Sequence, residues 1–195
     1  MQLGEDTITM SMTLNPVNEA AFQKAVQSLE TLNRAAVFHP TGTGKSCIAW
    51  KVVEAHPQTT FFWLVAGAQR LALRQAELTR YNGGTLPGNV RFCDCEKLAA
   101  ATPEQWVRLG EQKPGCVVLD CYHELSAVCW AQSVQKLLRM CPQAKVLGLG
   151  VPNGAPVCAA AQELFADCIV SHMTVAEAMA AGTMPVPSAL SLIHI

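Results

Sequence analysis

Short apolar runs alternate with amphipathic stretches along most of the chain. The amphipathic stretches have helical spacing; residues 18–32, for example, place Phe22, Val26 and Leu29 along one stripe. The apolar runs are rich in Val, Leu and Phe, which is typical of buried strands. They predict strands at 35–38, 61–66, 90–93, 116–119, 145–149 and 167–170, and the stretches between them predict helices at 18–32, 45–55, 69–81, 96–101, 103–109, 127–140 and 156–165.

This alternation of buried strands and helices predicts an α/β fold. Strands of this kind form a mostly parallel, doubly wound sheet with helices on both faces. Ligands of such sheets bind at the carboxyl ends of the strands. The residues that follow each predicted strand are therefore the first place to look for a functional site.

The segment after the first predicted strand has the composition of a phosphate-binding loop. Glycines let backbone N–H groups approach phosphate oxygens, and a helix that begins there favours an anion. A lysine can reach the β- and γ-phosphates, and a hydroxyl can bind Mg²⁺. Thr41, Gly42, Thr43, Gly44, Lys45 and Ser46 fill these positions, whereas His39 stands where the strict pattern has its first glycine. We therefore expect ATP and Mg²⁺ as cofactors.

The loop His-Pro-Thr-Gly-Thr-Gly-Lys-Ser (39–46) resembles motif I of superfamily 2 helicases and translocases, the DEAD/DEAH-box relatives. Residues 117–124 resemble motif II, the Asp-Glu-x-His box, with Asp120 and His123 at its first and last positions. Residues 61–75 are similar to motif Ia, in which a strand leads into a helix that touches the nucleic-acid backbone. The order of the later segments is similar to bacterial type III restriction-like helicases, over about residues 14–187.

The resemblance implies a RecA-like P-loop NTPase fold and specific roles for single residues. Lys45, Asp120, Cys121 and His123 take the catalytic positions, and Ser46 and Asp120 take the Mg²⁺ positions. The partner it implies is nucleic acid, with DNA favoured over RNA. Arg70 and Arg74 are the residues we expect to contact its phosphates, although a solvated helix face explains them equally well.

The sequence departs from the family at several positions. Cys121 replaces the glutamate that orients the attacking water, and a thiol with a pKa of about 8.5 is mostly neutral at pH 7. Glu124 is a possible substitute. Residues 150–152 lack both hydroxyls of the family's Ser-Ala-Thr motif III, so His123 is either a coupling residue or an ordinary polar residue at a strand end. Asn18 is a weak candidate for the adenine-reading position.

These departures leave more than one function open. The favoured interpretation is the ATP-binding motor domain of a superfamily 2 DNA helicase or translocase with impaired hydrolysis. The alternative is a catalytically inactive nucleotide-binding switch or scaffold. A small P-loop metabolite kinase is disfavoured, because the segment after Gly150 lacks the arginines of a phosphate lid.

Composition narrows the class of protein further. With 195 residues, 50% hydrophobic and 15% charged, the chain can bury a core and is neither disordered nor a charged coiled coil. A net charge of -1 does not indicate a strongly basic nucleic-acid binder, although a neutral domain can carry a basic strip. Nine cysteines without a C-x-x-C pair suggest a reduced chain. The longest apolar run, 61–68, is too short to span a membrane, and we expect a cytoplasmic protein.

The expected domain organisation is an N-terminal tail over 1–15, the ATP-binding domain over 16–187, and a non-native tail over 188–195. Residues 190–195 resemble a translated sequencing adapter, which suggests a truncated reading frame. Motors of this family also need a second RecA-like domain, and we expect it to be missing from this chain.

Overall fold

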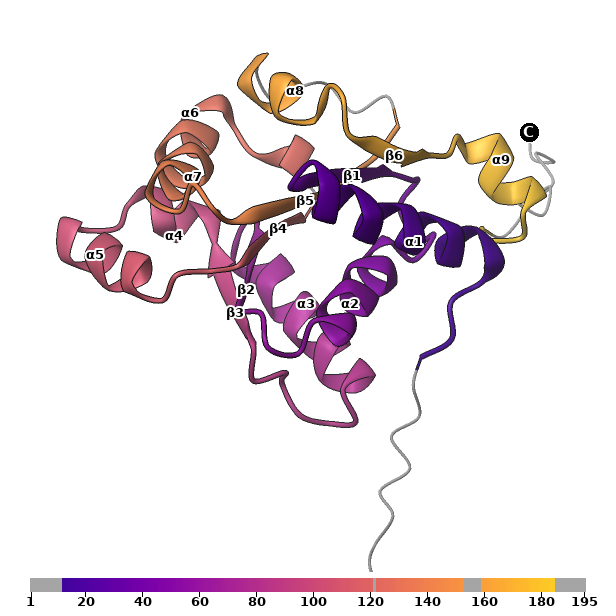
Figure 1. Ribbon diagram of the computed structural model, residues 1–195, viewed down its shortest axis with the longest axis horizontal. Coiled ribbons are helices and arrows are strands. Elements are labelled where there is room, and N and C mark those ends of the chain that lie inside the picture. Colours follow the sequence, from indigo (N-terminus) through magenta and orange to yellow (C-terminus); the bar gives the residue numbers. More distant parts are fainter. Residues whose placement is uncertain (1–11, 121, 153–158, 185–195) are drawn as a thin grey trace, which may run out of the picture.

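In the computed structural model, which describes residues 12–120, 122–152 and 159–184, the strands form one parallel sheet (Figure 1). Its order is β3-β2-β4-β5-β1-β6, and every described pairing is parallel. The strands are β1 (Arg34–Phe38), β2 (Phe61–Val65), β3 (Val90–Asp94), β4 (Cys116–Asp120), β5 (Lys145–Gly150) and β6 (Ile169–His172).

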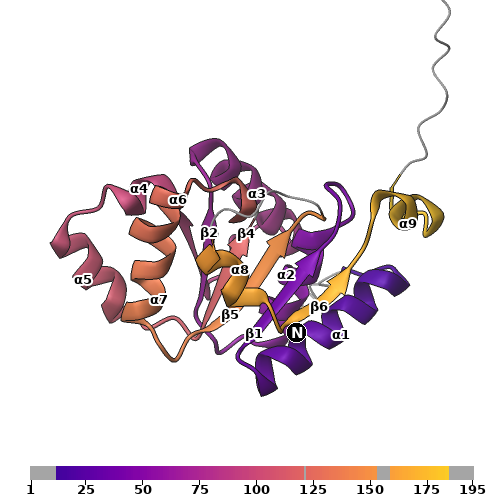
Figure 2. The same ribbon diagram turned by 90° about the horizontal axis from the view of Figure 1, so that it is seen from above.

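Helices cover both faces of this sheet, as Figure 2 shows. One face carries α1 (Pro16–Thr31), α2 (Lys45–Ala55) and α3 (Ala68–Tyr81). The other face carries α4 (Cys95–Ala99), α5 (Pro103–Glu111), α6 (Ala127–Cys129), α7 (Lys136–Met140) and α8 (Ala159–Phe165). The last helix, α9 (Val175–Ala180), follows β6. Successive strand side chains point to opposite faces. In β2, Trp63 therefore packs with α1 and α2, whereas Phe62 and Leu64 pack in the core on the other side. The predicted α/β fold is confirmed.

The predicted elements match the observed ones closely, with three differences. The helix predicted over 127–140 contains a π-helical segment, Trp130–Gln135, in which the Ser133 hydroxyl donates to the Cys129 carbonyl four residues earlier. The last strand begins at Ile169 rather than 167, because the N–H of Cys168 still donates to the Phe165 carbonyl. Helix α9 was not predicted.

Several sequence predictions lie outside the described residues. These are Cys121, the start of the helix predicted over 156–165, the tail over 188–195, and all but the end of the tail over 1–15. The described cysteines are Cys47, Cys93, Cys95, Cys116, Cys129, Cys141 and Cys168. All seven are free thiols in this structure. In the same part of the chain, no helix has the length and apolar character needed to cross a membrane.

Candidate functional site

The phosphate loop, residues 39–46, connects the end of β1 to the start of α2. Gly42 and Gly44 have φ angles of 86° and 90°, in the left-handed region that favours glycine. A Cβ at Gly42 would meet no atom within 4 Å, so the loop is open at this point. A Cβ at Gly44 would lie 2.8 Å from the side-chain nitrogen of Asn18. Both glycines therefore meet a backbone requirement; Gly42 borders open space, whereas Gly44 packs against Asn18.

Lys45 folds back over its own loop. Its Nζ donates to the carbonyls of His39 (2.7 Å) and Pro40 (2.9 Å), and the residue is buried. The Thr43 hydroxyl donates to the same Pro40 carbonyl at 2.8 Å. Ser46 follows in the first turn of α2 and is half-buried. A positive charge and the start of a helix thus converge on the loop, an arrangement that suits an anionic phosphate.

Asn18, on α1, holds the loop from the side. Its Nδ2 donates to the Thr43 carbonyl at 2.8 Å, in a buried hydrogen bond between residues 25 positions apart. Its Oδ1 is buried and accepts no hydrogen bond from the described residues. This contact to the loop itself was not expected from the sequence. The adenine-reading role suggested for Asn18 stays a prediction.

His39 connects the loop to the edge strand β6. The side chain is fully buried, and its Nε2 lies 2.8 Å from the Ser171 hydroxyl. Burial, together with the nearby charges of Lys45 and His172, lowers the pKa of His39 from 6.5 to about 4. The imidazole is therefore neutral at pH 7. The residue that replaces the usual glycine thus makes a tertiary contact that a glycine could not make.

Asp120 ends β4 at the same edge of the sheet. It pairs in register with Leu149 of β5, which in turn pairs with Val37 of β1. Since neighbouring strands are separated by about 4.8 Å, Asp120 lies about 10 Å across the sheet from Val37, close to the start of the phosphate loop. Its side chain is on the face covered by α2 and accepts from Trp63 Nε1 through Oδ2 at 3.1 Å. The phosphate loop and Asp120 therefore lie on the same face of the sheet, with β5 between their strands.

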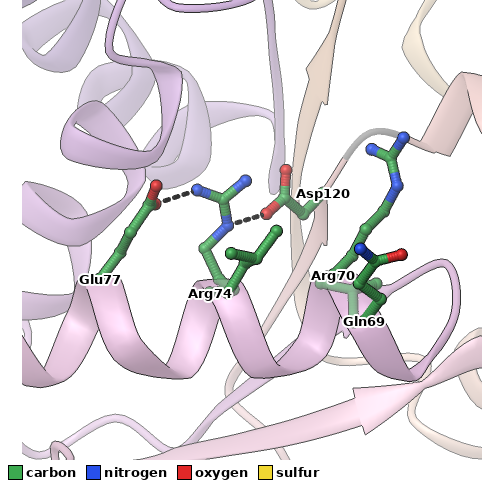
Figure 3. Close-up of a pocket in the computed structure, with 7 residues that line it drawn as sticks. Gln69, Arg70, Arg74, Glu77 and Asp120 are labelled. Atoms are coloured by element: carbon green, nitrogen blue, oxygen red, sulfur yellow. Dashed lines mark hydrogen bonds and ion pairs between the residues drawn. The ribbon is translucent and has the colours of Figure 1, made fainter.

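The partner that the sequence did not predict for Asp120 is Arg74 of α3. Arg74 Nε lies 2.5 Å from Asp120 Oδ2, and Arg74 Nη1 also forms an ion pair with Glu77 (Figure 3). The side chain of Asp120 is 3% exposed and that of Arg74 is 20% exposed. The guanidinium thus bridges two carboxylates, one buried and one closer to solvent.

Beside this ion pair lies a cavity of about 380 Å³. It is lined by Val65, Gln69, Arg70, Leu73, Arg74, Glu77 and Asp120. Arg70, one of the lining residues, forms an ion pair with Glu124. Both arginines predicted to contact nucleic acid therefore line one cavity next to motif II, and both are paired with carboxylates. Their contact with nucleic acid stays a prediction.

A 3₁₀ turn over Tyr122–Glu124 follows the strand end. His123 is largely buried, and its Nε2 lies 3.6 Å from Glu124 Oε1. Burial lowers the pKa of His123; the charges of Lys45 and Arg70 add to this effect, and those of Glu124 and Asp120 oppose it. His123 therefore lies within the electrostatic field of both halves of the site. Glu124 is engaged by Arg70, so no contact places it at the water-orienting position suggested by the sequence.

No protein-family model matches the sequence, and no curated protein matches it. Among solved structures, the chain is similar to the ATP-dependent Type ISP restriction-modification enzyme LlaBIII bound to DNA. The TM-score is 0.60 and the sequence identity 12%, over 88% of this chain. The chain covers only 16% of the length of that protein. At this identity the likeness concerns the fold alone, and it confirms the predicted RecA-like architecture.

Proposed function

We propose that this chain contains, over residues 16–187, the first RecA-like domain of a superfamily 2 DNA helicase or translocase of the type III restriction-like group. The observation that carries the proposal is that the phosphate loop and Asp120 lie on one face of the sheet, at its carboxyl edge, with β5 between their strands. ATP turnover in a longer parent protein would drive movement along DNA.

The residues present fit ATP and Mg²⁺. The open space at Gly42 admits a phosphate group, and Lys45 can exchange its two loop carbonyls for phosphate oxygens. Mg²⁺ would be held by the Ser46 hydroxyl and the Asp120 carboxylate, together with water and phosphate oxygens. The described residues contain no cluster of three or more His, Cys, Asp or Glu side chains that could hold a metal. When bound, the ion neutralises charge that develops on the phosphates.

Hydrolysis is expected to be slow. Cys121 stands at the position where the family has its water-orienting glutamate. Positioning by a general base is typically worth about 10²–10⁴ in rate. The structure gives Glu124 a different partner, Arg70, so it does not support Glu124 as the replacement.

The alternative is a catalytically inactive nucleotide-binding switch or scaffold. It is favoured by the same Cys121 and by the ion pair that Arg74 forms with the metal-binding carboxylate. ATP hydrolysis distinguishes the two functions, because a motor must hydrolyse ATP whereas a switch needs only to bind it.

The test begins with the affinity of a fluorescent ATP analogue for the chain, for Lys45→Ala and for Lys51→Ala. Lys51 lies on the same helix but forms an ion pair with Glu54, so its variant is the matched control. We expect Lys45→Ala to weaken binding at least about tenfold, because it removes a charged hydrogen-bond donor to phosphate. Equal binding by the chain and Lys45→Ala would refute the phosphate site.

The second step is ATPase activity with single-stranded DNA, measured for the chain and for Cys121→Glu. Restored turnover in Cys121→Glu supports a damaged motor. Nucleotide binding that depends on Lys45, without turnover in either protein, supports the switch.

A further inference from the structure

We propose that Arg74 is a positioning residue that couples nucleic-acid binding to the metal-binding state of Asp120. The inference rests on the proposed function and deepens it. In the absence of nucleic acid, Arg74 holds the Asp120 carboxylate and competes with Mg²⁺. A nucleic-acid phosphate that draws Arg74 away frees the carboxylate for the metal of ATP·Mg²⁺.

The first step of the argument is the strength of the contact. Arg74 Nε lies 2.5 Å from Asp120 Oδ2, and the aspartate side chain is 3% exposed. Charges removed from water attract each other more strongly than the same charges at the surface. Oδ2 also accepts from Trp63 Nε1 at 3.1 Å. A metal ion that approaches this oxygen must therefore displace or repel a bound guanidinium.

The second step is that Arg74 has a second carboxylate partner. Glu77 lies three residues further along α3, on the same side of the helix, and already shares the guanidinium. Its side chain is 38% exposed, so a guanidinium that leaves Asp120 keeps a carboxylate partner nearer to solvent. Loss of the Asp120 contact therefore does not leave Arg74 without a carboxylate partner, which lowers the cost of moving the guanidinium away from Asp120.

The third step identifies what draws the guanidinium away. Arg74 lines a cavity of about 380 Å³ together with Arg70 and Gln69 of the first turn of α3. In this helix of 14 residues, the side chains of Gln69, Arg70 and Arg74 project from the same side (Figure 3). These three side chains can donate hydrogen bonds to a phosphate oxygen that enters the cavity from solvent. A backbone phosphate of a nucleic-acid strand is the occupant we assign.

Thermodynamic linkage then sets the direction of the effect. If a nucleic-acid strand favours the state in which Asp120 is free, it must raise the affinity for ATP·Mg²⁺, and ATP·Mg²⁺ must raise the affinity for the strand by the same factor. The affinity for ATP without metal is not expected to change, because Asp120 acts on nucleotide through the ion.

The test measures binding of a fluorescent ATP analogue with Mg²⁺ or with EDTA, each with and without single-stranded oligodeoxythymidine. For the unmodified chain, we expect the oligonucleotide to raise affinity about fivefold or more with Mg²⁺ and to have no effect with EDTA. In Arg74→Gln, affinity with Mg²⁺ is already raised and the oligonucleotide adds nothing. Arg80→Gln, an exposed arginine on the same helix, behaves as the unmodified chain.

A second variant protects the test against a folding defect in Arg74→Gln. Glu77→Gln removes the alternative partner of Arg74 at a partly exposed position, and it should lower the affinity for the Mg²⁺ form without oligonucleotide. An oligonucleotide effect of equal size in EDTA would overturn the coupling. So would an effect that persists in Arg74→Gln, or Mg²⁺-dependent affinity that Glu77→Gln leaves unchanged.

A measurement without nucleotide separates this inference from the proposed function. The Trp63 indole N–H, assigned from the spectrum of Trp63→Phe, reports on Asp120 Oδ2 by NMR. Oligonucleotide alone should move this resonance in the unmodified chain and in Arg80→Gln, but not in Arg74→Gln. The coupling would be overturned if the resonance stays in place while labelled oligonucleotide binds, or if the oligonucleotide does not bind. Either result is independent of what Lys45→Ala shows about the nucleotide site.

Discussion

Acidification should destabilise the folded chain through His39, well above the pH at which most carboxylates titrate. The imidazole is fully buried, and burial together with Lys45 and His172 lowers its pKa to about 4. In the unfolded chain it returns to the ordinary value of 6.5. Between these values the unfolded state binds a proton that the folded state does not bind. The free energy of unfolding therefore rises with pH across this window.

The size of the effect follows from the two pKa values. The stabilisation is fully present above pH 6.5, falls as the pH is lowered, and levels off below about pH 4. One pKa unit corresponds to about 1.4 kcal/mol, so the limit is about 3 kcal/mol. Between about pH 7.5 and about pH 5 the same linkage predicts a loss of about 2 kcal/mol. His123 adds a smaller loss of the same sign, because burial lowers its pKa as well.

Urea unfolding at these two pH values, for the unmodified chain and His39→Asn, measures this loss. Asparagine keeps a polar group near Ser171 but does not titrate. The variant should be less stable at pH 7.5 and should lose much less stability on acidification, with His123→Asn run in parallel to remove the smaller contribution. An unmodified chain that is equally stable at both pH values would refute the reasoning. A His39→Asn chain that loses as much as the unmodified one would refute it too.

Three further predictions concern packing, helix capping and the loop. Gly148→Ala should destabilise the fold by about 1–3 kcal/mol in urea unfolding, because its Cβ would lie 2.5 Å from the Phe165 ring; Gly88→Ala, with open space at its Cβ, is the control. Thr102→Ala should cost about 1 kcal/mol by the same measurement, because it removes the capping box of α5. Asn18→Ala should weaken binding of a fluorescent ATP analogue several-fold, because the phosphate loop loses its buried hydrogen bond, and unchanged affinity would argue against that role.

The elements could be predicted because their signals are local. The strand 116–120 is a run of apolar residues that ends in one acid, and the helix 45–55 begins where a glycine loop ends. Helix α9 also had a local signal that was overlooked, since Thr174 and Glu177 form a capping box at its start. The π-helical segment within 127–140 had none, because its apolar spacing fits an ordinary helix and only the Ser133 hydroxyl on the Cys129 carbonyl marks the departure.

Local patterns also locate the site but not its internal contacts. The spacing of glycines and Lys45 predicts a phosphate loop, and the rule for parallel sheets predicts that Asp120 ends at the same edge. Neither pattern contains the hydrogen bond from Asn18 to the loop or the contact of His39 with Ser171 on β6, which join residues 25 and 132 positions apart. The contact of His39 depends on sheet order, because β1 lies between β5 and β6, and that of Asn18 depends on the packing of α1 beside α2.

Arg74 shows most clearly what a sequence pattern can and cannot establish. It lies on the helix after β2, beside the strand end at Asp120, and its predicted contact with a nucleic-acid backbone stays a prediction. That place does not reveal that the guanidinium reaches inward to Asp120, 46 positions later in the sequence, as well as to Glu77. The ion pair with Asp120 and the predicted contact with a nucleic-acid phosphate are compatible, because a guanidinium carries several donors and pairs equally well with a carboxylate and a phosphate. The ion pair therefore does not remove Arg74 from the nucleic-acid hypothesis, and it supplies a physical route by which strand binding would reach the metal site.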